Sequence, residues 1–89
     1  MARQIKLNGR ELALLRTIGF GLGVTGEELQ ERMAMMPDEL VDILNTMLDS
    51  GYVEVASMKQ QLTVADLSTE TFELNPAFTT DLKEALKRR

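Results

Sequence analysis

The sequence predicts a single α+β domain, residues 1–89, in which helices precede a short sheet and one more helix follows it. Three segments place apolar residues at the three-and-four spacing of a helix with one buried side. Two shorter segments alternate apolar and polar residues, as half-buried strands do. A chain of 89 residues buries only about 60–65 per cent of its unfolded surface. Its free energy of unfolding should therefore be small, unless contacts with a partner add to it.

The first helix should begin after Asn8 and run to about Ile18. Asn8, followed three residues later by Glu11, is a helix-start signal. The Asn side chain can accept a hydrogen bond from a free amide of the first turn, and the Glu side chain can reach back toward the start of the helix. The glycine-rich segment 19–23 then ends this helix. Its GxGxG spacing is interpreted as a linker, because a phosphate-binding loop requires a preceding strand. Val24, just after the linker, can add a brief edge strand to a later hairpin.

A pair of helices is predicted next, over residues 26–33 and 37–49. Thr25 begins a Thr-x-x-Glu capping box, which starts the first of these helices. Pro37 opens the second, because the first residue of a helix needs no amide hydrogen. Gly51 suits the left-handed residue that follows many helices.

Two strands are predicted at residues 52–55 and 71–74, where apolar and polar residues alternate. The polar stretch between them has an inner part, 61–66, that can extend either strand. Asn75 and Pro76 stop the sheet and start a last helix with one apolar stripe. The core should collect the apolar residues of all these elements: Leu15, Ile18, Leu29, Leu40, Leu44, Leu48, Val53, Val55, Phe72, Leu74 and Leu82.

Segment 25–55 combines two short helices, a tight turn and an apolar strand. Its most characteristic residues lie at the end of the second helix and just beyond it: Leu44, Leu48, Gly51, Tyr52 and Val53. With these residues it resembles the core of the winged helix-turn-helix superfamily. The resemblance implies a small winged helix-turn-helix with a three-helix core, a two- to three-stranded wing and a C-terminal helix. It also implies that helix 37–49 enters the DNA major groove and that the wing contacts a neighbouring phosphate.

The distribution of charge disfavours DNA contact by helix 37–49. Residues 25–51 carry seven acids and one base, whereas residues 1–24 carry four bases and one acid. DNA presents one negative charge per about 1.7 Å and binds nonspecifically through displaced counterions, so a carboxylate-rich helix repels the groove. Asn45 can still contact an adenine if basic residues elsewhere hold the phosphates. The same carboxylates also fit a face that is simply solvated.

The residue types exclude several classes of function. The sequence holds no Cys and no His, which removes disulfides, thiol nucleophiles, the usual zinc ligands and histidine acid–base chemistry. We therefore expect no enzyme activity, no cofactor and no metal. No run of about 20 apolar residues occurs, so we expect no membrane contact and a cytoplasmic location.

The sequence thus predicts a non-catalytic binding module whose main activity is a protein–protein contact or self-association through the acidic face of helix 37–49. That face comprises Asp38, Glu39, Asp42, Asn45, Thr46 and Asp49. The alternative is a DNA-binding transcriptional regulator that uses the same helix and the wing. Its nucleic-acid contacts would come from Arg3, Lys6, Arg10, Asn45, Thr46, Lys59, Gln60 and Gln61.

A homodimer is also expected, because two apolar segments lie outside the three-helix unit. One is an alternating N-terminal stretch and the other is the last helix. The candidate dimer contacts are Ile5, Leu7, Phe78, Leu82 and Leu86. The competing arrangement is a monomer in which the last helix packs back on the first and closes the core.

Overall fold

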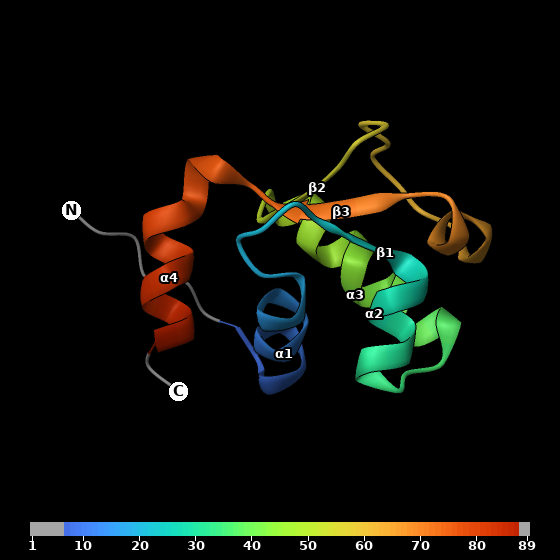
Figure 1. Cartoon of the computed structure of the whole chain (residues 1–89), viewed down its shortest axis with the longest axis horizontal. Coiled ribbons are helices and arrows are strands. Elements are labelled where there is room, and N and C mark those ends of the chain that lie inside the picture. Colours follow the sequence, from blue (N-terminus) through green and yellow to red (C-terminus); the bar gives the residue numbers. More distant parts are fainter. Residues whose placement is uncertain (1–6, 88–89) are drawn as a thin grey trace.

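Four α-helices and a three-stranded antiparallel sheet make up residues 7–87, the part of the chain that the computed structural model describes (Figure 1). In chain order the elements are α1 (Gly9–Ile18), β1 (Val24–Thr25), α2 (Gly26–Met33), α3 (Pro37–Ser50), β2 (Val53–Val55), β3 (Thr71–Leu74) and α4 (Thr79–Lys87). Two short 3₁₀ helices, η1 (Val64–Ser68) and η2 (Pro76–Phe78), precede β3 and α4 respectively. The predicted α+β class and the predicted order of helices and strands are confirmed.

The helix ends follow the capping signals of the sequence. The Glu11 amide donates to Asn8 Oδ1 at 2.8 Å and the Asn8 amide donates to Glu11 Oε1 at 3.0 Å, which is a reciprocal capping box. Thr25 Oγ1 accepts from the Glu28 amide at 3.1 Å and so starts α2. Gly51 ends α3 with a φ of 89°, a left-handed conformation that favours glycine.

β3 is the central strand, and β1 and β2 lie antiparallel on its two sides. Val24 pairs with Phe72 between β1 and β3, which confirms the brief edge strand expected after the glycine-rich connector. Val55 pairs with Phe72 from the other side. All three side chains are buried, so the strands share one face that packs on the helices.

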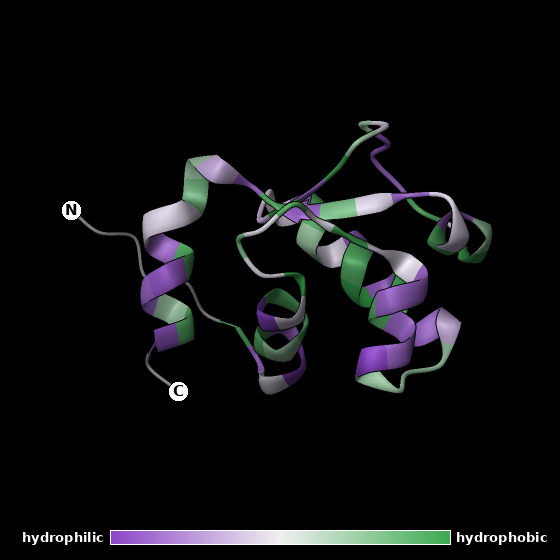
Figure 2. Cartoon of the chain, viewed as in Figure 1, coloured by the Kyte–Doolittle hydropathy of each residue, from purple (hydrophilic) through white to green (hydrophobic). Residues whose placement is uncertain are grey.

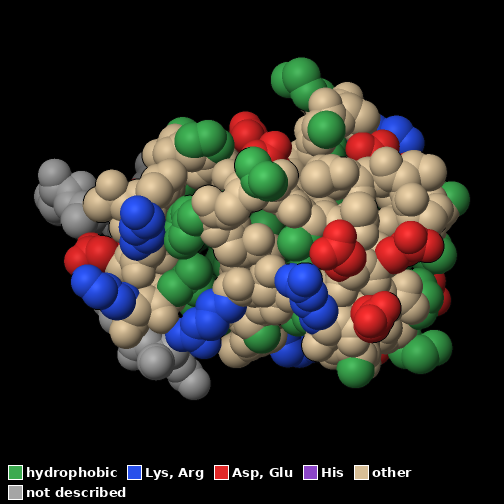
Figure 3. All heavy atoms as spheres, in the orientation of Figure 1, with side chains coloured by type: hydrophobic (Ala, Val, Ile, Leu, Met, Phe, Trp, Pro, Cys, Tyr) green, Lys and Arg blue, Asp and Glu red, His purple; other side chains and the backbone are tan. Residues whose placement is uncertain are grey.

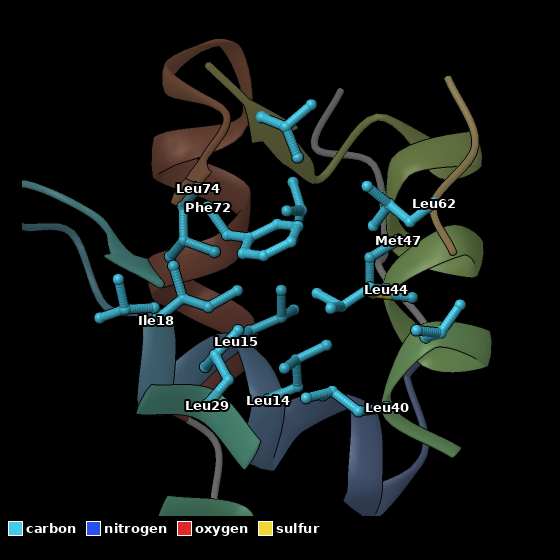
Figure 4. Packing of buried hydrophobic residues seen from close by; sticks show 14 of the residues in the cluster. Leu14, Leu15, Ile18, Leu29, Leu40, Leu44, Met47, Leu62, Phe72 and Leu74 are labelled. Atoms are coloured by element: carbon cyan, nitrogen blue, oxygen red, sulfur yellow. The ribbon is translucent and has the colours of Figure 1, made fainter. Parts of the chain in front are cut away.

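The core lies between this sheet and the helices and is built mostly from leucine (Figure 4). Leu44 of α3 and Phe72 of β3 are fully buried. Ten of the eleven residues expected in the core are buried, and Leu48 is half-buried against it. In Figure 2, α2 is largely hydrophilic because only one narrow side of this helix reaches the core.

The segment between β2 and β3 differs from the expectation that residues 61–66 extend a strand. It runs as a loop to Thr63 and then forms η1, in which Asp66 Oδ2 accepts from the Thr63 amide at 2.8 Å. Asp66 is buried, and a buried carboxylate requires hydrogen-bond donors that a strand at this place would not supply. Leu67 then packs η1 against Gly26 at the start of α2.

α4 packs back on α1 within the same chain. Leu82 is fully buried, and Arg16 Nη2 of α1 donates to the Leu86 carbonyl oxygen at 2.7 Å. The rings of Tyr52 and Phe78 meet edge to face, with centroids 5.2 Å apart. The last helix therefore closes the core of its own chain.

Candidate functional site

The exposed side of α3 and the loop that follows β2 form the candidate site. Leu40, Leu44 and Met47 fill the core side of α3, so the helical period turns the opposite residues outward. Five of the six residues expected on the outward side are exposed: Asp38, Glu39, Asp42, Thr46 and Asp49. We call these five residues the α3 face and residues 56–63 the wing loop.

Two contacts set the borders of the α3 face. On one border Arg10 of α1 forms an ion pair with Glu39 at 3.1 Å. Both side chains of this pair are at least half exposed, so it contributes roughly 1 kcal/mol or less to stability and opens readily. On the other border the wing loop is attached to α3 through Asn45 and Leu62.

Asn45 does not belong to the α3 face, although the helical period places it there. Its Nδ2 donates to the Leu62 carbonyl oxygen at 3.2 Å, and its Oδ1 accepts from the Leu62 amide at 2.7 Å. Leu62 is buried where no strand pairs with it, so its backbone groups need side-chain partners. The Asn45 amide, which was expected to contact a partner or an adenine, therefore anchors the wing loop through both of its polar ends.

Lys59 likewise bonds to a residue within the segment between β2 and β3. Its Nζ donates to Asp66 Oδ1 at 2.6 Å. This hydrogen bond, together with that from the Thr63 amide, holds the pKa of Asp66 below its usual value, and the Asp66 carboxylate raises the pKa of Lys59. Lys59, which was expected to contact a phosphate, is thus paired with a buried carboxylate, while its own side chain is 48% exposed. Gln60 and Gln61 beside it are exposed.

The other residues expected to contact nucleic acid are Arg3, Lys6, Arg10 and Thr46. Arg10 is paired as described above, and Arg3 and Lys6 lie outside the described residues. Thr46 donates its hydroxyl to the Asp42 carbonyl oxygen at 3.0 Å. The α3 face thus consists of four carboxylates and this one hydroxyl.

Two exposed methionines accompany these carboxylates. Met36, the residue just before α3, is 66% exposed, and Met58 in the wing loop is 84% exposed. Met58 also has a φ of 63°, which is uncommon for a residue other than glycine. Long thioether side chains suit adaptable contacts with other proteins. An exposed methionine thus lies just before α3 and another lies in the wing loop.

The residues expected at a dimer interface are largely used inside the chain. Leu82 is fully buried, while Leu7, Phe78 and Leu86 are half-buried against the core. Ile5 lies outside the described residues. The assignment of Leu82 to a dimer contact is corrected, because α4 directs this residue into the core of its own chain.

Two exposed apolar residues that sequence reasoning did not select lie between α1 and β1. Phe20 is 44% exposed and Leu22 is 99% exposed. Lys83 of α4 lies over the Phe20 ring, with Nζ 5.6 Å from the centroid. The signal in the sequence was their alternation with glycines, because a glycine-rich connector has no regular element that can bury an apolar side chain.

Within residues 7–87, no three side chains among Asp, Glu, His and Cys are grouped so that they could hold a metal ion. No helix in the same range has both the length and the apolar character needed to cross a membrane. Comparison with protein-family models found no match, and neither did comparison with curated proteins or with solved structures.

Proposed function

We propose that this chain is a non-catalytic winged-helix module that binds a basic, partly apolar segment of a protein partner through the α3 face and the wing loop. The observation that carries this proposal is the set of four carboxylates on the α3 face, with no base among them. The winged-helix assignment is supported by the order of elements and by the wing loop, which lies beside α3 where a wing would lie.

The charge of the α3 face favours a cationic partner. Asp38, Asp42 and Asp49 are exposed and form no ion pair with any residue in the range 7–87. Exposed carboxylates are well solvated, so the free protein keeps them at little cost. Their combined field accelerates the approach of a basic segment and disfavours acidic ones.

The apolar part of the proposed partner follows from the exposed methionines. A purely ionic contact would be weak and sensitive to salt. Met36 and Met58 add apolar surface at the start of α3 and in the wing loop. A basic amphipathic helix presents both kinds of side chain and is a common ligand of methionine-containing surfaces.

The contacts of Asn45 and Lys59 count against the DNA-binding alternative. Affinity for DNA requires cationic groups against phosphates, and base reading requires a free donor or acceptor. Lys59 is paired with Asp66, and both polar ends of the Asn45 side chain are bonded to Leu62. DNA-binding regulation would therefore depend on groups outside the α3 face.

A synthetic amphipathic helix of Lys and Leu, labelled with fluorescein, tests the proposal by fluorescence anisotropy. We expect the wild-type chain to bind it and the double variant Asp38→Lys, Asp42→Lys to lose binding. The control is Glu27→Lys, Glu31→Lys, which changes the same charge at the second and sixth residues of α2 instead of α3. Equal losses in the two variants would mean that net charge alone attracts the peptide and would overturn the proposed site.

Duplex DNA of random sequence provides the second arm of this experiment. We expect the wild-type chain to bind it hardly at all at physiological salt. The variant at Asp38 and Asp42 should bind it more tightly and with a steeper salt dependence, because repulsion is replaced by attraction. A steep negative salt slope in the wild-type chain would favour the DNA-binding alternative.

A further inference from the structure

A groove of about 520 Å³ lies between the connector 19–23 and α4. Phe20 and Leu86 supply its apolar lining. Lys83, Lys87 and Glu84 also line it, so its charged side chains leave one positive charge in excess. In Figure 3, hydrophobic side chains fill a hollow between α4, at the left, and the rest of the molecule, and Lys and Arg side chains flank it. An apolar depression with cationic edges is therefore open to solvent on this surface.

The side chain of Leu22, in the same connector, does not pack against the described part of its own chain. It is 99% exposed and stands between two glycines. Gly23 has a φ of 99°, and a Cβ at this position would lie 3.0 Å from Glu73 Cγ. The connector is thus held close against β3 in a conformation that requires glycine, and this conformation presents Leu22 to solvent.

We propose that two copies of this chain associate about a two-fold axis, with Leu22 of each copy inserted into the groove of the other. A two-fold interface is isologous, so the inserted residue and its receiving groove must lie on one surface of the same chain. The connector meets this requirement, because Phe20 lines the groove and Leu22 lies only two residues further along. The proposal is independent of the proposed function of the α3 face.

The charges near Leu22 and in the groove are complementary. Glu73 is exposed, lies against the connector at Gly23 and lines a hollow together with Lys83 of its own chain. The groove carries Lys83, Lys87 and Glu84, so one positive charge is in excess there. Two-fold symmetry brings the Glu73 carboxylate of each copy toward the lysines of the other. Opposite charges at the edge of an apolar contact fix its register and accelerate association.

Sedimentation velocity over a dilution series, from micromolar to millimolar chain, tests the dimer. We expect the mass to rise from the 10.0 kDa of one chain toward twice that value. Leu22→Ser should weaken dimerisation by roughly a hundredfold or more, because each buried leucine contributes on the order of tenfold and the dimer buries two. Met58→Ser removes another exposed apolar side chain and should leave the dimer unchanged.

A mixing experiment tests the reciprocal insertion itself. Thr80 is exposed and lines the groove, so Thr80→Arg should block the groove without disturbing the fold. Leu22→Ser and Thr80→Arg should each be monomeric alone, yet an equimolar mixture should form a heterodimer that retains one intact insertion. A wild-type chain that stays at 10.0 kDa throughout, or a Leu22→Ser chain that dimerises normally, overturns the proposal and leaves the groove to an unlike partner.

Discussion

Among the described glycines, Gly26 should be the one whose replacement by alanine lowers the stability of the domain most. A Cβ at Gly26 would lie 2.4 Å from the carbonyl oxygen of Leu67 and 2.5 Å from its Cα, whereas real Cβ contacts essentially never fall below 3.0 Å. Both atoms belong to the backbone of η1, so no side-chain rotation can relieve the clash. Gly26→Ala must therefore push η1 away from α2 and disturb the buried Leu67.

Overpacking of this kind typically costs about 1–3 kcal/mol. The better helix propensity of alanine returns less than about 1 kcal/mol, and less still at the first residue of a helix. A domain of 89 residues has a free energy of unfolding of roughly 4–13 kcal/mol. Gly26→Ala should thus lower the thermal midpoint by about 4–8 °C for each kcal/mol lost, as measured by circular dichroism.

Gly9→Ala is the matched control for this prediction. Gly9 is also the first residue of its helix and also follows a capping residue, but a Cβ there meets nothing within 4 Å. Its replacement should leave stability unchanged or raise it by up to about 1 kcal/mol. If the two variants have equal midpoints, the close contact between α2 and η1 does not exist as described.

Three further outcomes follow from the buried residues Leu44, Asp66 and Leu82. Leu44→Ala should lower the free energy of unfolding in urea by about 2–5 kcal/mol, since this side chain is fully buried, and a loss below 1 kcal/mol would place it outside the core. Asp66→Asn should be less stable than wild type at neutral pH, because the ionised carboxylate holds Lys59 and the start of η1. The folded-state pKa of Asp66 lies below its usual 3.8, so the stability difference is full above pH 3.8 and should shrink as pH falls through that lower pKa; a pH-independent difference contradicts the assignment. A chain truncated after Asn75 should be unfolded by far-UV circular dichroism, because it lacks Leu82, whereas a folded product would show that α4 is dispensable.

Sequence reasoning located the elements whose signals are local. Asn8 with Glu11, Thr25, Pro37 and Gly51 each act within one helical turn, and the helix boundaries agree with them to within a residue. The segment between β2 and β3 could not be predicted in the same way. The buried position of Asp66 depends on Lys59, seven residues earlier in a stretch without periodicity. The place of η1 depends in addition on its contact with Gly26, which is remote in sequence.

The candidate site shows the same division between local and long-range information. The period of α3 correctly turned its carboxylates outward, because the core side of the helix is marked by apolar residues alone. The same period predicted that Asn45 faces solvent. It could not show that the backbone of Leu62 lies against Asn45, because that contact joins residues distant in sequence. The exposure of Leu22 depends on how the connector is held against β3, which composition does not show.

The two proposed surfaces use different elements, and this separation makes their functions separable by mutation. The α3 face attracts cations through Asp38 and Asp42, whereas the groove on α4 carries Lys83 and Lys87 and receives Leu22. Leu22→Ser should therefore leave the affinity of each chain for the basic peptide unchanged. The lysine substitutions at Asp38 and Asp42 should leave the dimer intact. Coupling between the two, with peptide binding falling as the dimer dissociates, would instead mean that the peptide contacts both copies at once, because only then does the second copy contribute to its affinity.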